Sequence, residues 1–154
     1  PAAVPLIREG AMAELLVSPR SAREFGVLGN GADAQESPDA LFLEGGDLAA
    51  NDVLGALGDG LWISNLWYLN FSDRTACRAT GMTRFATLLV EGGEVVAPVN
   101  VMRFDDSLFR VLGQGLLALT DTPELRLESS TYGRRQTGGV SVPGALVEGF
   151  TFTL

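Results

Sequence analysis

The residues best suited to catalysis are scarce in this chain, which contains no histidine. Histidine is the usual general base near neutral pH and the commonest ligand of transition metals. Ser–His–Asp and Cys–His catalysis, and zinc sites that use histidine, therefore cannot be assembled from this chain alone. Chemistry that uses only carboxylates remains open.

One cysteine and two neighbouring aspartates are the other candidates for chemistry. Cys77 has Arg78 beside it, and a cationic neighbour favours the reactive thiolate. Without a histidine base, a buried or incidental cysteine is the favoured interpretation. Asp105 and Asp106 could serve as metal ligands or as an acid–base pair. The simpler interpretation, which we favour, is that they cap the N-terminus of a helix.

Arginines are spread through the central, strand-like part of the chain. Arg78 and Arg84 are an even number of residues apart, so on one strand both could face the same side. One interpretation is a groove that grips a carboxylate or a peptide backbone. The other, slightly favoured, is a sheet edge where arginines pair with acids. The arginines concerned are Arg74, Arg78, Arg84 and Arg103, and the acids are Asp73, Asp105 and Asp106.

These arginines lie among the strongest strand signals. Residues 61–71 are rich in aromatic and β-favouring side chains, which predicts a strand. A polar turn, an arginine-bearing return and the apolar run 86–90 follow, and Glu-Gly-Gly-Glu at 91–94 predicts a two-residue hairpin. Turn chemistry comes from Asn70, Ser72 and Asp73.

Aromatic side chains in the same stretch are expected to form part of the core and an interface strip. They are Trp62, Trp67, Tyr68 and Phe71. Any of them left exposed would mark a surface for a partner.

Capping residues predict two short helices. Ser18 is a candidate N-cap, Pro19 suits the first helical position, and Gly26 is a stop signal. A second helix is expected from Asn51, as N-cap, to a stop at Gly58.

A third helix is expected to open at Asp105-Asp106-Ser107 and to continue through a leucine-rich stripe to Leu119. Gly113 and Gly115 weaken its interior. With about eight short strands joined mostly by hairpin-type turns, the chain is predicted to be α+β and predominantly antiparallel β. We expect a barrel-like or sandwich-like β domain with two or three short helices.

Composition limits the class of protein further. With 154 residues the chain is expected to form a single domain, and its net charge of −8 disfavours nucleic acid as a partner. No apolar run approaches the roughly 20 residues of a membrane span, so no membrane partner is expected. One cysteine and no signal-peptide pattern are typical of a cytoplasmic protein. Because residue 1 is proline, we expect the chain to belong to a longer protein.

Four strings of the sequence carry a family resemblance. They are GLWISNLWYLNFSD from Gly60, TGMTRFATLLVEGGEVVAPV from Thr80, MRFDDSL from Met102 and VPGALVEGFTFT from Val142. Together they resemble the C-terminal domain of the TldD/PmbA family, proteins described as modulators of DNA gyrase and regarded as metallopeptidases. The Thr-Gly-Met-Thr-Arg motif at 80–84 is the most specific part.

The resemblance implies a two-domain parent in which this β-rich domain follows an N-terminal α/β domain. Catalytic family members carry zinc on an H-E-x-x-x-H helix, with a cysteine ligand from late in the C-terminal domain. They cleave extended or unfolded peptides held by strand pairing, and they act as homo- or heterodimers. The implied role of this chain is to shape the substrate channel and the dimer interface. We expect substrate-binding residues among Thr80, Thr83, Arg84 and Arg103.

The chain departs from the catalytic pattern in two places. It has no H-E-x-x-x-H, and in the late glycine-containing loop Tyr132 stands nearest to the position of the cysteine ligand. No catalytic residue and no metal ligand are therefore assigned here, and zinc is expected only in the full-length parent or its partner. The alternative function is a non-catalytic, PmbA-like subunit or adaptor of a metal-bearing peptidase. A weaker alternative is an unrelated β-rich binding module.

Overall fold

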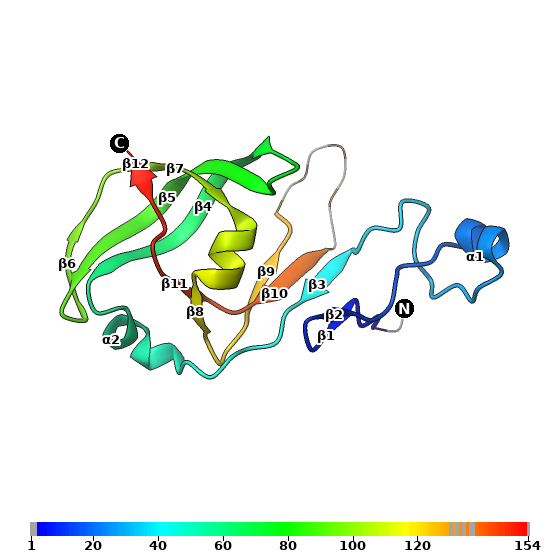
Figure 1. The fold of residues 1–154 in the computed structure, drawn as a ribbon, viewed down its shortest axis with the longest axis horizontal. Helices are drawn as coiled ribbons and strands as arrows, with labels where there is room; N and C mark the ends of the chain where they lie inside the picture. The colour runs from blue at the N-terminus through cyan, green and yellow to red at the C-terminus, as the bar shows by residue number, and fades with distance from the viewer. Residues whose placement is uncertain (1–2, 130, 132, 134, 136–137, 154) are drawn as a thin grey trace. The chain divides into compact units, whose positions relative to one another are not determined.

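The computed structural model describes residues 3–129, 131, 133, 135 and 138–153. Its residues form two compact units, one made of residues 1–42 and 126–140 and the other of residues 43–125 and 141–154. Figure 1 shows the order of the elements along the chain. The prediction of a single domain remains a prediction.

The first unit is built from short elements. Strands β1 (Ile7–Arg8) and β2 (Ala11–Met12) form an antiparallel pair. Helix α1 (Pro19–Phe25) begins as predicted, because the Ser18 hydroxyl accepts a hydrogen bond from the Ser21 N–H. It ends at Gly26, whose φ of 67° is the left-handed conformation that favours glycine.

A three-stranded sheet has the order β3–β10–β9. Its strands are β3 (Ala40–Phe42), β9 (Glu124–Leu127) and β10 (Gly139–Val142), and the division between the two units passes through β9 and β10. All four residues of β9 are exposed.

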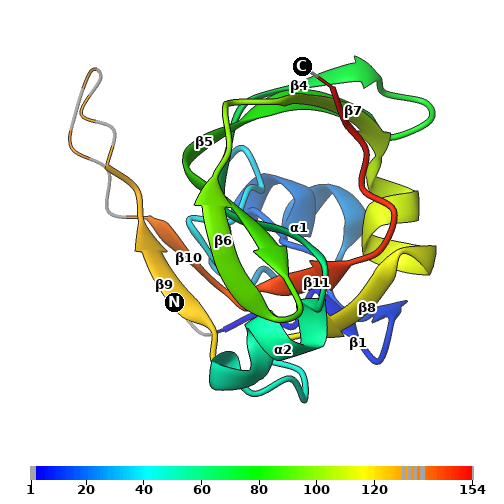
Figure 2. The same cartoon turned by 90° about the vertical axis from the view of Figure 1, so that its left-hand side faces the viewer.

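The second unit is organised around a five-stranded antiparallel sheet. Its order is β12–β7–β5–β4, and β6 also pairs with β5. The two long strands, β4 (Gly60–Asp73) and β5 (Arg78–Glu91), run side by side in Figure 1. The shorter ones are β6 (Glu94–Pro98), β7 (Arg103–Ser107) and β12 (Phe152–Thr153). Figure 2 shows the β5–β6 hairpin, whose predicted two-residue turn is confirmed by positive φ angles at Gly92 and Gly93.

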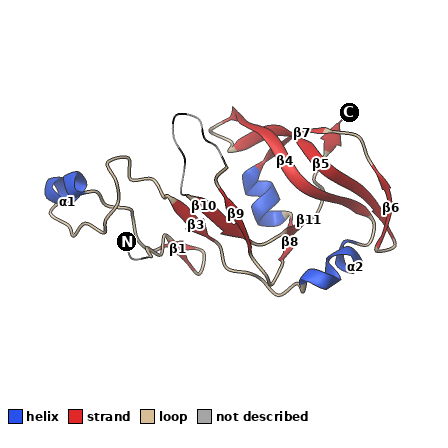
Figure 3. Cartoon of the chain, turned by 180° about the vertical axis from the view of Figure 1, so that it is seen from behind, coloured by secondary structure: helices blue, strands red, loops and turns tan. Residues whose placement is uncertain are grey.

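A smaller sheet pairs β8 (Leu116–Leu119) with β11 (Ala145–Val147). The helical residues between β7 and β8, which include the π-helical turn η2 (Arg110–Gln114), lie between this pair and the large sheet in Figures 1 and 3. The 3-10 turn η1 (Ala50–Asp52) and helix α2 (Val53–Leu57) precede β4. The most buried core side chains are Ala79, Val90, Phe104 and Val111, together with the polar Thr83 and Thr87.

Phenylalanines join the last strand to the sheet. Phe152 pairs with Phe104 across β12 and β7, and the Phe150 ring lies 5.1 Å from that of Phe104, centroid to centroid. The Phe150 and Phe152 rings are 4.8 Å apart. The alternating closing segment therefore places both phenylalanines on one aromatic cluster of the core.

Strands predominate in Figure 3, and the predicted α+β, mainly antiparallel class is confirmed. The strand orders of the described residues do not close into a barrel, so the sandwich-like alternative fits better. Within the described residues no helix is long and apolar enough to cross a membrane.

Two helix predictions need correction. Asn51 is not an N-cap, because it lies inside the 3-10 turn η1, although the stop at Gly58 is confirmed. The helix expected from Asp105 to Leu119 is much shorter: both aspartates lie in strand β7, and residues 116–119 form strand β8. Ladder pairing with β5 and with β11 replaces the helical hydrogen bonds at its two ends.

Candidate functional site

The pairing of β5 with its neighbours places most of the proposed site residues on one face of the sheet. Ala79, Gly81 and Thr83 are buried, so the residues that alternate with them point to the opposite side. We call that side the outer face. It carries Thr80, Met82 and Arg84 of β5, Trp67 and Asn70 of β4, and Arg103 and Asp105 of β7, which follow from the register of the paired strands.

Two β-bulges interrupt the β4–β5 ladder on either side of Trp67 and Arg84. Between the pairs Ile63–Thr87 and Asn65–Arg84, strand β5 has one extra residue, and between Trp67–Met82 and Asn70–Thr80 the extra residue is in β4. Phe85 and Tyr68 occupy these bulges with φ of 62° and 59°. Left-handed backbone is unfavourable for bulky side chains, so the surrounding ladder must hold both residues there.

The bulges leave large aromatic side chains in contact with solvent. Trp67 is 47% exposed, Tyr68 73% and Phe85 75%. Phe71, nearer the turn, is 54% exposed. An exposed aromatic strip therefore lies on β4, and its predicted role as an interface stays a prediction, while Trp62 is only partly accessible.

Arg84 is held by aromatic rings. The carbon of its guanidinium lies 4.2 Å from the centroid of the Trp67 ring and 5.1 Å from that of Phe85. Both distances are within the range of cation–π attraction, which is strongest for tryptophan. Among the described residues, neither Arg84 nor Arg103 forms an ion pair.

Arg78 does pair with an acid, as the slightly favoured interpretation predicted. Arg78 Nη1 lies 3.0 Å from the Asp105 carboxylate and also donates to the backbone carbonyl of that residue. The pair is about half exposed, so its contribution to stability is small. Of the four arginines named from the sequence, Arg78 is thus neutralised, whereas Arg84 and Arg103 have no ion-pair partner among the described residues of the outer face.

The two threonines nominated for substrate binding both form internal hydrogen bonds. The Thr80 hydroxyl donates to the Phe104 carbonyl at 2.9 Å. Thr83 is fully buried, and its hydroxyl oxygen accepts from the Met102 N–H at 3.1 Å. Thr80 therefore lies on the outer face with its hydroxyl bonded to β7, whereas Thr83 lies on the buried side.

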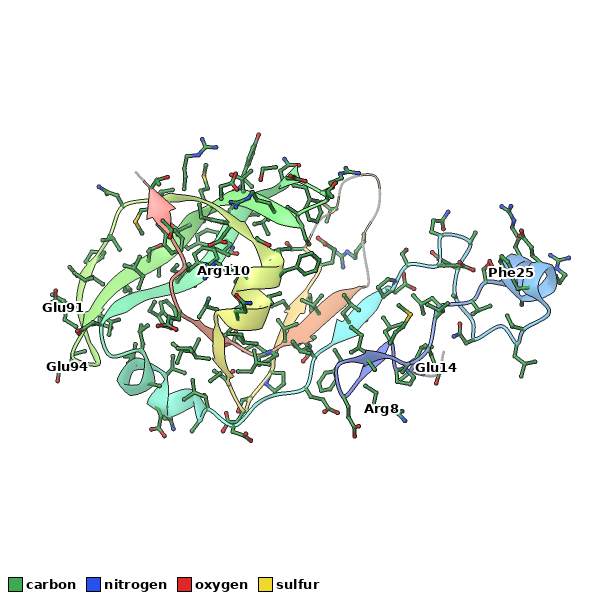
Figure 4. All side chains as sticks on the ribbon, viewed as in Figure 1. Arg8, Glu14, Phe25, Glu91, Glu94 and Arg110 are labelled. Atoms are coloured by element: carbon green, nitrogen blue, oxygen red, sulfur yellow. The ribbon has the colours of Figure 1, made fainter. Side chains whose placement is uncertain are left out.

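Asp106 has a role that the sequence did not reveal. It lies on the buried side of β7, where both carboxylate oxygens accept hydrogen bonds from Arg110 of η2. The distance from Arg110 Nε to Asp106 Oδ1 is 2.9 Å. Arg110 is labelled in Figure 4 on the helical segment beside the sheet, and it also donates to the Glu148 carbonyl. The spacing of four residues between Asp106 and Arg110 is the sequence signal for this pair, although the sequence alone favours a helix cap for Asp106.

The electrostatics of this pair are clear in direction. The hydrogen bonds from Arg110 lower the pKa of Asp106, partial burial opposes that shift, and the Ser107 N–H adds to it. The same hydrogen bonds raise the pKa of Arg110. Asp106 therefore fastens the helical segment to the sheet as a charged group.

The remaining candidates show no catalytic arrangement. Cys77 is half-buried at the turn between β4 and β5, where its N–H donates to the Arg74 carbonyl. In the described part of the chain, no group of three or more histidine, cysteine, aspartate or glutamate side chains could hold a metal ion. Tyr132, nearest to the position of the cysteine ligand, lies outside the described residues.

The outer edge of β4 is the last feature of the site. Within the described residues β4 pairs only with β5, so the far side of this 14-residue strand forms no ladder. An edge of this length offers N–H and C=O groups to an added strand.

Comparison with known proteins identifies the family of this chain. The family model of the PmbA/TldA metallopeptidase C-terminal domain matches residues 2–154 of this chain. The chain belongs to this family. No curated protein sequence matches it.

Two solved structures share the fold of this PmbA/TldA domain. One is described as a candidate modulator of a DNA gyrase from Thermotoga maritima, with a TM-score of 0.69 and 16% identity over 93% of this chain and 31% of that one. The other is TldE from Thermococcus kodakarensis, with a TM-score of 0.72 and 16% identity over 97% of this chain and 33% of that one. This chain thus spans about a third of each neighbour.

Proposed function

We propose that this chain is the C-terminal domain of a longer TldD/PmbA-type protein that acts in the proteolysis of extended or unfolded peptides. Its part is to bind the peptide along β4 and to help form the substrate channel and a homo- or heterodimer interface. We place the protein in the cytoplasm, without nucleic acid or membrane as a partner. Membership of the metallopeptidase family supports this proposal.

The observation that carries the proposal is the free edge of β4. The strand is 14 residues long, pairs on one side only within the described residues, and has an exposed aromatic strip beside that edge. A peptide added as a strand gains main-chain hydrogen bonds whatever its sequence, which suits a protein that acts on unfolded chains. Thr80, Arg84 and Arg103 lie on the adjoining outer face, and the Arg84 guanidinium, which lies over Trp67 of β4, is the group placed nearest to such a peptide.

A metal ion, which the family description implies, does not fit the described residues of this chain. The sequence has no histidine, and the described residues contain no cluster of metal-binding side chains. We therefore assign the metal to another part of the parent protein or to a partner subunit, and derive no catalytic step from this domain.

The test compares two peptides that differ only in their ability to pair as strands. A labelled β-prone peptide of about six residues, a typical strand length, is titrated with the chain and followed by fluorescence anisotropy. A second peptide carries N-methyl groups on alternate residues of the pairing edge, which removes the donors but keeps the side chains. Loss of binding by the methylated peptide is expected. Equal binding of both peptides, or of neither, would refute the proposal.

The alternative is a non-catalytic subunit that positions a metal-bearing partner. The tyrosine at position 132, nearest to the position of the cysteine ligand in catalytic relatives, favours it. Zinc content and peptide cleavage of the full-length parent, alone and mixed with its partner, separate the two functions. Metal and cleavage in the parent alone support catalysis, whereas activity that appears only with a metal-bearing partner supports the adaptor.

A further inference from the structure

The outer face holds an arginine in a form suited to binding an anion. The planar guanidinium of Arg84 lies near two rings, 4.2 Å from Trp67 and 5.1 Å from Phe85. Ring contacts restrict the long side chain without using its hydrogen-bond donors. Part of the side-chain entropy that an arginine normally loses on binding is therefore already lost in the folded chain.

Positive charge on this face is local and uncompensated. Arg103 is paired with Met82, the residue two positions before Arg84, so the two arginines come from neighbouring strands. In the described part of the molecule neither has an acidic partner, whereas Asp105 is already bound to Arg78 and Asp106 to Arg110. A chain with a net charge of −8 thus presents a small cationic spot bordered by aromatic rings.

Backbone strain points to the same spot. Phe85 and Tyr68 have left-handed φ angles and exposed rings. They occupy the two bulges that lie on either side of Trp67 and Arg84. Bulges of this kind re-aim side chains, and strained residues gather at binding sites. Removing either strain would require only glycine, yet both positions carry large aromatic residues.

We propose that this spot is a specificity site for a carboxylate of the extended peptide, bound by the guanidinium of Arg84 with Arg103 nearby. The exposed Trp67 and Phe85 rings contact the apolar part of the same peptide. The inference rests on the proposed function, and it adds a preference for acidic segments to binding that otherwise reads only the backbone. The carboxylate belongs to an internal glutamate or aspartate or to the C-terminus of the peptide, since both offer the same two oxygens.

Nucleic acid fits the spot less well. Aromatic rings and arginines on a sheet can stack bases, but tracking a phosphate backbone takes a positively charged groove. Here the face has two uncompensated arginines and the chain is acidic overall, which opposes an extended polyanion. One guanidinium fork is matched to one carboxylate.

The experiment measures the binding of matched acidic and neutral peptides by anisotropy. Three β-prone peptides are identical except for an internal glutamate, an internal glutamine, or a glutamine with a free C-terminal carboxylate; the first two have amidated ends. We expect the unmodified chain to bind at least one acidic peptide about tenfold more tightly than the neutral one, as for a charge-assisted hydrogen bond. Which acidic peptide is preferred identifies the source of the carboxylate.

Variants localise the preference. R84M keeps the side-chain stem and should lose the tenfold preference while still binding the neutral peptide. R84K keeps the charge without the planar fork and should retain only part of it. R20M is the matched control, because it removes the same charge from an arginine that is 87% exposed on α1, and it should behave as the unmodified chain. Thermal unfolding of each variant confirms that it is folded.

Each other outcome overturns the inference. Tight binding of all three peptides without preference, or a preference that survives R84M, refutes the carboxylate site and leaves the proposed strand pairing intact. Failure to bind any peptide refutes both. Displacement of the acidic peptide by a single-stranded oligonucleotide, blocked by R84M, assigns the spot to nucleic acid instead.

Discussion

The ring of Phe104 lies directly against the backbone of Gly81 on the neighbouring strand. A Cβ at position 81 would come within 2.9 Å of two ring carbons and equally close to the Trp67 carbonyl oxygen. The glycine of the Thr-Gly-Met-Thr-Arg motif is thus explained by packing, since only a residue without a side chain lets the ring and both flanking strands approach.

Substituting this glycine tests that explanation. We expect Gly81→Ala to lower the free energy of unfolding by about 1–3 kcal/mol, the usual cost of overpacking. Gly55→Ala in α2 is the control, because nothing lies within 4 Å of its added Cβ. It should raise stability by up to about 1 kcal/mol through helix propensity. Urea unfolding measures both changes, and equal stability of the two variants would contradict the packing argument.

A second prediction separates structure from binding at Thr83. Thr83→Val keeps the shape but leaves the partly buried Met102 N–H without its acceptor, at a cost of about 1–3 kcal/mol. Thr83→Ser keeps the hydroxyl and should lose only about 0.8 kcal/mol for its missing methyl group. Because Thr83 is fully buried, neither variant should change peptide affinity when folded. Lost affinity with unchanged stability would instead assign Thr83 to the substrate site.

Local signals predicted the parts of the fold that local forces decide. The N-cap at Ser18, the stop at Gly26 and the turn at Gly92-Gly93 all depend on backbone preferences of a few residues, and all are present. The stripe of leucines before Leu119 failed as a predictor, because a short apolar run suits a helix or a strand equally. Pairing with residues 145–147, far along the chain, made it a strand.

The site was predicted only in part for the same reason. Strand parity predicts that Arg84 shares a face with Arg78, but the bulge at Phe85 that accompanies the stacking of Arg84 has no sequence signature, since phenylalanine disfavours a positive φ. The opposite sides taken by Thr80 and Thr83 follow from the alternation of side chains along a strand. Which of those sides is buried depends on the aromatic cluster supplied by the end of the chain.

The strain at Phe85 gives a third prediction. Phe85→Ala and Phe85→Gly both remove an exposed ring, but only glycine accepts the φ of 62° without a steric penalty. The glycine variant should therefore be the more stable of the two by about 1 kcal/mol. Thermal or urea unfolding provides the comparison. The reverse order, which holds at ordinary strand positions, would show that the bulge is not strained.

The Asp106–Arg110 pair predicts how stability depends on pH. Folding lowers the pKa of Asp106 below its usual value of 3.8, chiefly through the hydrogen bonds from Arg110. A depressed carboxyl pKa stabilises the folded state above the unfolded-state pKa, and this contribution disappears as the pH falls through the folded-state value. Arg110 stays charged throughout, because its own pKa is raised. Stability should thus decline below about pH 4, where the unfolded carboxyl begins to take up protons.

Replacing the aspartate should weaken this acid-induced loss. Asp106→Asn removes the titrating group and should cost about 1–3 kcal/mol at pH 7, because Arg110 loses its charged acceptor. Asp105→Asn removes an equal charge from the exposed pair with Arg78 and should cost less than about 1 kcal/mol. Urea unfolding between pH 3 and pH 7 gives both quantities. If Asp106→Asn unfolds with the same pH dependence as the unmodified chain, the pair does not fasten the helical segment as a charged contact.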